Sequence, residues 1–158
     1  MLQSNPWSCF PICVSILTEI AFDKLIKVIG HDGSKIVYPE RMDISRYEAF
    51  SLDEIGIALL KLGWSATSFK ACIKHKGSEI LLTNYPDLPE ISKLLTDLKL
   101  PTIITIQKEH NQHCLAWKPQ TNTYIDPLTG IEKEAWYDQP MLIVDFIVLA
   151  RIKYNGSQ

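Results

Sequence analysis

The sequence predicts an α+β fold, with N-terminal helices packed on a C-terminal antiparallel sheet. Before Pro101, apolar residues recur at helical spacing, and capping residues and glycines mark the ends of these segments. After Pro101, the apolar runs are short, rich in β-branched and aromatic residues, and separated by turn residues. Helices that precede the strands, instead of alternating with them, are typical of an α+β protein.

The first predicted helix begins near Pro11, because proline suits the first turn of a helix. Asp23 is the expected N-cap of a second short helix, KLIKVI, which ends at Gly30 in a left-handed conformation. The polar sequence HDGSKIVYPERMD then forms a loop. The first helix carries its apolar residues at helical spacing: Ile12, Cys13, Ile16, Leu17 and Ile20.

Ser51 and Glu54 have the spacing of a capping box, so a third helix is expected over IGIALLKL, ending at Gly63. A strand is predicted over residues 64–69, and a further helix over LPEISKLLTDLKL, with Pro89 in its first turn. The strands of the C-terminal sheet are TIITIQ, HCLAWK, NTYID and LIVDFIVLARIKY. The N-terminal helix is expected to bury its apolar face on this sheet.

The composition is that of an ordinary globular protein with one domain, residues 1–158, because 46% of the residues are hydrophobic and 22% charged. The net charge of −2 gives no electrostatic basis for a nucleic-acid or anionic-lipid partner. No apolar run reaches the roughly 18 residues of a membrane span, since MLIVDFIVLA is short and contains Asp145. The sequence sets no oligomeric state.

The cysteines do not suggest a disulfide framework, because Cys9, Cys13, Cys72 and Cys114 stand at irregular spacing. The N-terminus has no basic segment followed by an apolar one, so no secretory signal is expected. These features favour a cytoplasmic protein, or one delivered by a secretion system that needs no signal. Cys13 is expected in the core, and so is Cys114, on the strand face opposite His113.

Cys9 lies where the first helix is about to begin, two residues before Pro11. Free backbone N–H groups and the positive end of the helix dipole favour a thiolate at this place. The alternative interpretation is a small buried hydrophobic residue. A nucleophilic thiol also needs a base that accepts its proton, and the base needs a group that orients it.

His113 and Asp126 are the predicted base and orienting group. His113 opens the strand HCLAWK, and the next strand ends in YIDP. A loop at residues 118–121 would place Trp117 opposite Asn122, and His113 opposite Asp126 with Cβ atoms about 4.5–5.5 Å apart. This prediction depends on the register, because a slip of one residue sends a side chain to the other face. Asp126 before a proline is also typical of a turn.

Gln3 lies six residues before Cys9 and is a candidate donor to the oxyanion of an acyl-transfer reaction, together with the backbone N–H of Cys9. Trp7 and Phe10 flank the thiol, and they either line a substrate groove or pack in the core. His31 is a third groove candidate. Its sequence, GHDGS, forms either a wall of the site or a plain turn after a helix.

These residues resemble the papain-like cysteine peptidases, and the bacterial branch that includes bacteriocin-leader peptidases is the nearest. The nucleophile motif of that branch reads Asp-Cys-Gly-Pro, and this chain has Ser8-Cys9-Phe10-Pro11, which keeps the cysteine and the proline. The sequence HCLAW…YIDP is similar to the family's His…Asp-Pro segment. The resemblance covers the two ends of the chain. It implies that Cys9 is the nucleophile, His113 the base, Asp126 its orienting group and Gln3 an oxyanion donor.

The resemblance also implies a papain-like fold and cleavage of a peptide or isopeptide amide bond in a protein or peptide substrate. Bacterial effectors that share this fold and triad include deamidases and acyltransferases, so deamidation of a protein glutamine, or acyl transfer, is the alternative. An inactive papain-like binding module is a second alternative. No cofactor is expected.

A zinc site is the competing interpretation of the cysteines and histidines. Cys9-x-x-x-Cys13 and His110-x-x-His113 offer four potential ligands. The histidine spacing is shorter than that of most structural zinc sites, and strand geometry turns the two histidines to opposite faces. No metal is therefore predicted.

Overall fold

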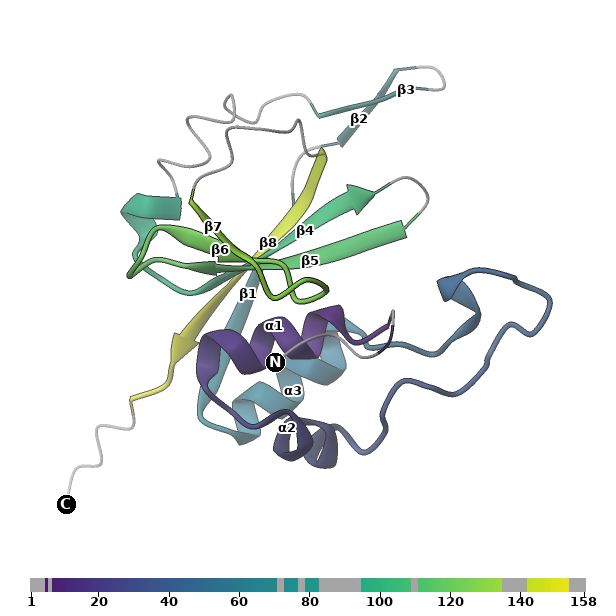
Figure 1. Cartoon of the computed structure of the whole chain (residues 1–158), viewed down its shortest axis with the longest axis horizontal. Helices are drawn as coiled ribbons and strands as arrows, with labels where there is room; N and C mark the ends of the chain where they lie inside the picture. The colour runs from purple at the N-terminus through teal and green to yellow at the C-terminus, as the bar shows by residue number, and fades with distance from the viewer. Residues whose placement is uncertain are drawn as a thin grey trace.

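The computed structural model describes residues 5, 7–70, 73–76, 79–82, 95–108, 111–134 and 142–153. Helices occupy the N-terminal part and strands follow, as Figure 1 shows. The elements are α1 (Cys9–Thr18), α2 (Phe22–Ile29), the short 3-10 helix η1 (Ile44–Arg46), α3 (Leu52–Lys61), β1 (Trp64–Lys70), β2 (Ile73–Lys76), β3 (Glu79–Leu82), β4 (Thr102–Lys108), β5 (Asn111–Lys118), β6 (Thr123–Ile125), β7 (Glu132–Glu134) and β8 (Leu142–Arg151).

Six of the strands form one antiparallel sheet in the order β1-β8-β4-β5-β6-β7. Helices α1, α2 and α3 gather on one side of this sheet, and the separate pair β2–β3 lies away from them (Figure 1). The predicted α+β class, with N-terminal helices and a C-terminal antiparallel sheet, is therefore confirmed. None of the helices within the described residues is long and apolar enough to cross a membrane.

The central strands of the sheet are buried on both faces, so their apolar residues divide into two cores. On the helix side, Ile103 of β4 and Ala116 of β5 pack with Leu59 of α3. On the other side, Ile104 and Trp117 pack with residues of the neighbouring strands. Because successive side chains of a strand point to opposite faces, both cores come from the same short runs of sequence.

The helix ends follow local capping chemistry. Gly30 closes α2 with a φ of 101°, which is the left-handed conformation that glycine adopts at little cost. Ser51 and Glu54 form the predicted capping box at the start of α3. The N-cap of α2 was predicted at Asp23 and is instead Ala21, so that Asp23 lies in the first turn, where its carboxylate faces the positive end of the helix.

The hairpin β5–β6 forms, but its predicted register is wrong by two residues. Trp117 pairs with Tyr124, not with Asn122. The reason is the turn, which spans residues 119–122: Pro119 has the φ that suits an early turn position, and Asn122 closes the turn with a left-handed φ of 56°. A shift of two residues keeps every side chain on its predicted face.

The predicted helix over residues 88–100 is seen in part. Residues 95–98 are helical, and Leu95 is fully buried against the face of the sheet opposite α1, α2 and α3. The rest of the predicted helix before residue 95 lies outside the described residues, as do Gln3, Cys72 and His110.

Candidate active site

Cys9 is the first residue of α1, and only 9% of its surface is exposed. The N-cap residue, Ser8, makes no side-chain capping bond, because its hydroxyl donates to the carbonyl oxygen of Asn5 at 3.1 Å. Pro11 has no N–H to satisfy. The backbone N–H groups of Cys9 and Phe10 therefore lie in the first turn without a side-chain cap, where an anion is favoured.

His113 of β5 and Asp126 are joined by a hydrogen bond of 2.8 Å between Nε2 and Oδ1. Asp126 directly follows β6, and its carboxylate is fixed because the same Oδ1 accepts the backbone N–H of Leu128 at 2.8 Å. The backbone N–H of Gly130 donates to the carbonyl oxygen of Asp126 at 2.7 Å and closes this loop. Since Asp126 engages Nε2, the other ring nitrogen, Nδ1, is the one that serves Cys9.

Cys9 contacts both His113 and Cys114. The pKa of Cys9 is lowered to about 5, and the largest cause is a hydrogen bond from the Cys114 thiol. Burial acts in the opposite direction, and the hydrogen bond and charge of His113 lower the pKa further. The backbone N–H of Cys114 also favours the thiolate. Two adjacent residues of β5, His113 and Cys114, thus both favour the thiolate form of Cys9.

The pKa of His113 moves in the opposite direction. Burial disfavours the imidazolium, but the hydrogen bonds and charges of Asp126 and Cys9 outweigh it and raise the pKa of His113 to about 9. At neutral pH, Cys9 and His113 therefore form a thiolate–imidazolium pair. A nucleophile that is already ionised, beside a charged acid, is suited to attack a carbonyl and protonate its leaving group.

The other described cysteines remain thiols. Burial raises the pKa of Cys13, which is fully buried in the core as predicted. The hydrogen bond to Cys9 and burial together raise the pKa of Cys114. Among the three cysteines that the structure describes, Cys9 is the one whose pKa is lowered.

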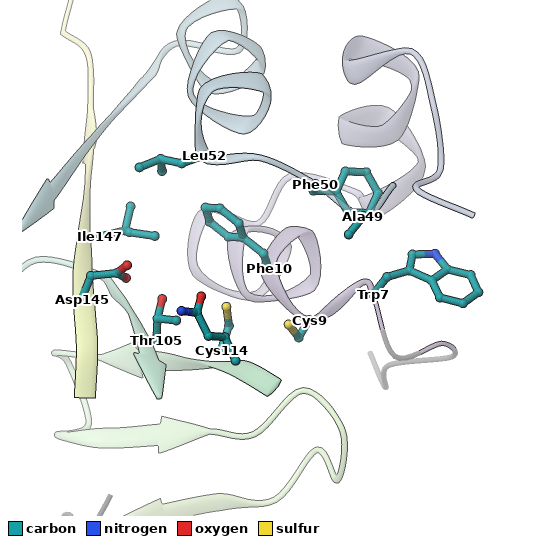
Figure 2. Close-up of a pocket in the computed structure, with 11 residues that line it drawn as sticks. Trp7, Cys9, Phe10, Ala49, Phe50, Leu52, Thr105, Cys114, Asp145 and Ile147 are labelled. Atoms are coloured by element: carbon teal, nitrogen blue, oxygen red, sulfur yellow. The ribbon is translucent and has the colours of Figure 1, made fainter. Parts of the chain in front are cut away.

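A pocket of about 300 Å³ opens beside Cys9. Figure 2 shows it between the start of α1, the segment before α3, and the face of the sheet. Cys114, Thr105 and Asp145 form its floor on three neighbouring strands, because Thr105 pairs with both of the others. The remaining lining residues are Trp7, Phe10, Ala49, Phe50, Leu52, Gln112 and Ile147.

One wall of the pocket depends on close packing around Gly33. This residue has a φ of 73°, and a Cβ placed on it would lie 2.9 Å from Phe50 Cε2 and 3.0 Å from Trp7 Cδ1. The indole N–H of Trp7 donates to the carbonyl oxygen of Asp32 at 3.1 Å. The GHDGS loop is therefore both the end of α2 and a support for the wall.

His31 is placed behind this wall and does not line the pocket. Its ring stacks on Phe50 with centroids 5.3 Å apart. Its Nε2 binds Glu54 at 3.1 Å, and its Nδ1 accepts the backbone N–H of Gly33, also at 3.1 Å. His31 thus connects the loop to the start of α3, whereas Trp7 and Phe10 line the pocket, and Phe10 also packs against the core.

Among the residues of this site that sequence reasoning missed are Cys114 and Asp145. Cys114 was expected only to pack in the core, and it does so, but it also contacts Cys9. Asp145 was considered only as a charge within the apolar run MLIVDFIVLA, and it lines the pocket. A carboxylate inside the apolar run MLIVDFIVLA was the available signal, because such a run is typical of a strand that is buried on both faces.

Within the described ranges, no three or more His, Cys, Asp or Glu side chains are arranged to hold a metal ion. No protein-family model matches the sequence, and a search of curated proteins finds no similar one.

Proposed function

We propose that this protein is a papain-like cysteine hydrolase that cleaves an amide bond in a peptide or protein. The observation that carries the proposal is the triad of Cys9, His113 and Asp126, which come from distant parts of the sequence. It supports acyl chemistry because it supplies a nucleophile, its acid–base partner and an orienting carboxylate at one place.

In the proposed reaction, the Cys9 thiolate adds to the carbonyl carbon of the amide. The backbone N–H groups of Cys9 and Phe10 are suited to hold the oxyanion, and the family resemblance adds the side chain of Gln3. His113 gives its proton to the leaving amine, and the C–N bond breaks to leave a thioester. Water then attacks the thioester, His113 accepts a proton from it, and the acid leaves as the thiolate is restored.

Asp126 has two tasks in this scheme. Its hydrogen bond to Nε2 fixes the imidazole so that Nδ1 faces the sulfur. Its negative charge stabilises the imidazolium, which is the form of His113 that protonates the amine.

The test is mass spectrometry of a mixture of unfolded model proteins after incubation with the wild type or with the Cys9→Ala variant. New peptide termini that need Cys9 support the proposed hydrolase. Glutamine that gains the small mass of an amide converted to an acid, again only with Cys9, assigns the same triad to deamidation. Identical spectra for the two proteins contradict both activities and favour a binding role.

A further inference from the structure

The pocket beside Cys9 contains a buried carboxylate oxygen that has no hydrogen-bond partner among the described residues. Asp145 Oδ1 is shielded from solvent and makes no hydrogen bond with any described residue. Burying a carboxylate oxygen without a partner is costly, because it loses its hydrogen bonds to water and gains none in return. If the partly buried side chain turns so that Oδ1 opens to the pocket, a ligand that supplies an N–H donor there would remove the cost.

Asp145 lies on the same face of the sheet as Cys114, the residue of β5 that contacts Cys9. Thr105 of β4 pairs with Cys114 on one side and with Asp145 on the other, so the three side chains share one face of the sheet. Cys114 contacts Cys9, and Asp145 lies two strands further on, at about 9.6 Å from Cys114 for a strand spacing of about 4.8 Å. Figure 2 shows the carboxylate turned toward Thr105 and Cys114.

Apart from Thr105 and Gln112, most of the other side chains that line the pocket are apolar. Phe10, Phe50, Leu52 and Ile147 line it, and the described lining residues include no cationic side chain. Long basic side chains have an apolar stem and a charged end, so they pack along such walls while the charge reaches a carboxylate. The interaction is stronger there than in water, because the pocket walls lower the local dielectric constant.

We propose that this pocket selects a substrate with a lysine or arginine side chain close to the amide that is cleaved, and that Asp145 binds its charged end. This inference rests on the proposed function, since it names the substrate class of that same site. An acidic side chain would be repelled by Asp145, and a neutral apolar one would leave Oδ1 without a partner.

The experiment compares dipeptidyl chloromethyl ketones that carry arginine, citrulline or norleucine at the ketone-bearing residue or at the one before it. Cys9 attacks the methylene carbon, a C–S bond forms and chloride leaves. Citrulline has the shape of arginine without its charge. Intact-protein mass spectrometry gives the rate of labelling, and we expect arginine to label the wild type roughly ten-fold faster than citrulline in at least one series.

Asp145→Asn keeps the size of the side chain and removes its charge, so the ratio of the arginine to the citrulline rate should fall to about one. Asp97→Asn, with the same change of charge on an exposed residue of the 95–98 helix, should leave the ratio unchanged. Equal rates for arginine and citrulline in the wild type, or a preference that survives Asp145→Asn, would overturn the inference.

Failure of the proposed function would look different. The rate ratio compares two reagents on one thiol, so it does not depend on how much of Cys9 is ionised. Iodoacetamide, which has no side chain to place in the pocket, measures the reactivity of the thiol by itself. An unreactive Cys9 would contradict the proposed hydrolase, whereas a reactive Cys9 without preference for arginine would contradict only the role of Asp145.

Discussion

Cys114 lies beside Cys9 and, as a hydrogen-bond donor, lowers the pKa of the Cys9 thiol, although the two residues are far apart in the sequence. The contact exists because α1 packs on the face of β5 that carries Cys114. It gives Cys9 a donor that is independent of His113. The neighbouring His113 provides a positive charge. Two consecutive residues of β5 therefore stabilise the Cys9 thiolate, Cys114 as a hydrogen-bond donor and His113 through its charge.

Removing this donor should make Cys9 less acidic. In Cys114→Ala, we expect the pKa of Cys9 to rise above its wild-type value of about 5, because the largest stabilisation of the thiolate is gone. The rate of iodoacetamide labelling at mildly acidic pH reports this change. Cys114→Ser, which still offers a hydroxyl donor, should recover part of the rate, and Cys13→Ala should leave it unchanged. A rate in Cys114→Ala that equals the wild-type rate would contradict the assignment.

The thiolate–imidazolium pair predicts that hydrolysis declines at both low and high pH. As the pH falls through about 5, Cys9 takes up a proton and both labelling and hydrolysis should decline. As the pH rises through about 9, His113 loses the proton that the leaving amine needs, so hydrolysis should decline while labelling by iodoacetamide continues. In His113→Ala, the labelling curve should move toward the ordinary thiol pKa of about 8.5. A wild-type midpoint near that ordinary value would exclude the ion pair.

Much of the site could be predicted because it depends on local chemistry. Pro11 and the apolar spacing place Cys9 at a helix start, and Ser51 with Glu54 fixes the start of α3. His113 and Asp126 were paired by a hairpin whose assumed register is wrong. Their contact survives because the error is an even number of residues, so both side chains keep their faces.

The rest of the site depends on contacts between segments that are distant in sequence. Asp145 reaches the pocket because β8 is inserted between β1 and β4, an order that no local pattern specifies. Cys114 becomes a donor because α1 crosses β5 at that residue. His31 was grouped with the groove because of its loop, and its stacking on Phe50 is likewise a tertiary contact.

Substitutions of Asp126 should separate its role at His113 from its role in the turn. In Asp126→Asn, the side-chain oxygen can still accept the N–H of Leu128, so the melting temperature should hardly change. The charge is lost, however, and the pKa of His113 should fall, as NMR titration of the ring protons would show. Asp126→Ala should lose about 1 kcal/mol of stability as well, and hydrolysis should drop by roughly 10²-fold or more. An unchanged His113 pKa in Asp126→Asn would reduce Asp126 to a turn residue.

The wall of the pocket should respond to a single methyl group. In Gly33→Ala, the new Cβ would meet Phe50 Cε2 at 2.9 Å and Trp7 Cδ1 at 3.0 Å, so one or both rings must move. We expect slower labelling by the dipeptidyl chloromethyl ketones, which occupy the pocket, and an unchanged rate with iodoacetamide, which does not. Gly30→Ala is the matched control, because Gly30 also has a positive φ, of 101°, but a Cβ there meets nothing within 4 Å. Both variants should lose roughly 1–2 kcal/mol of stability from the left-handed backbone, and only Gly33→Ala should alter the pocket. If the two variants label at the same rates with every reagent, Gly33 does not shape the site.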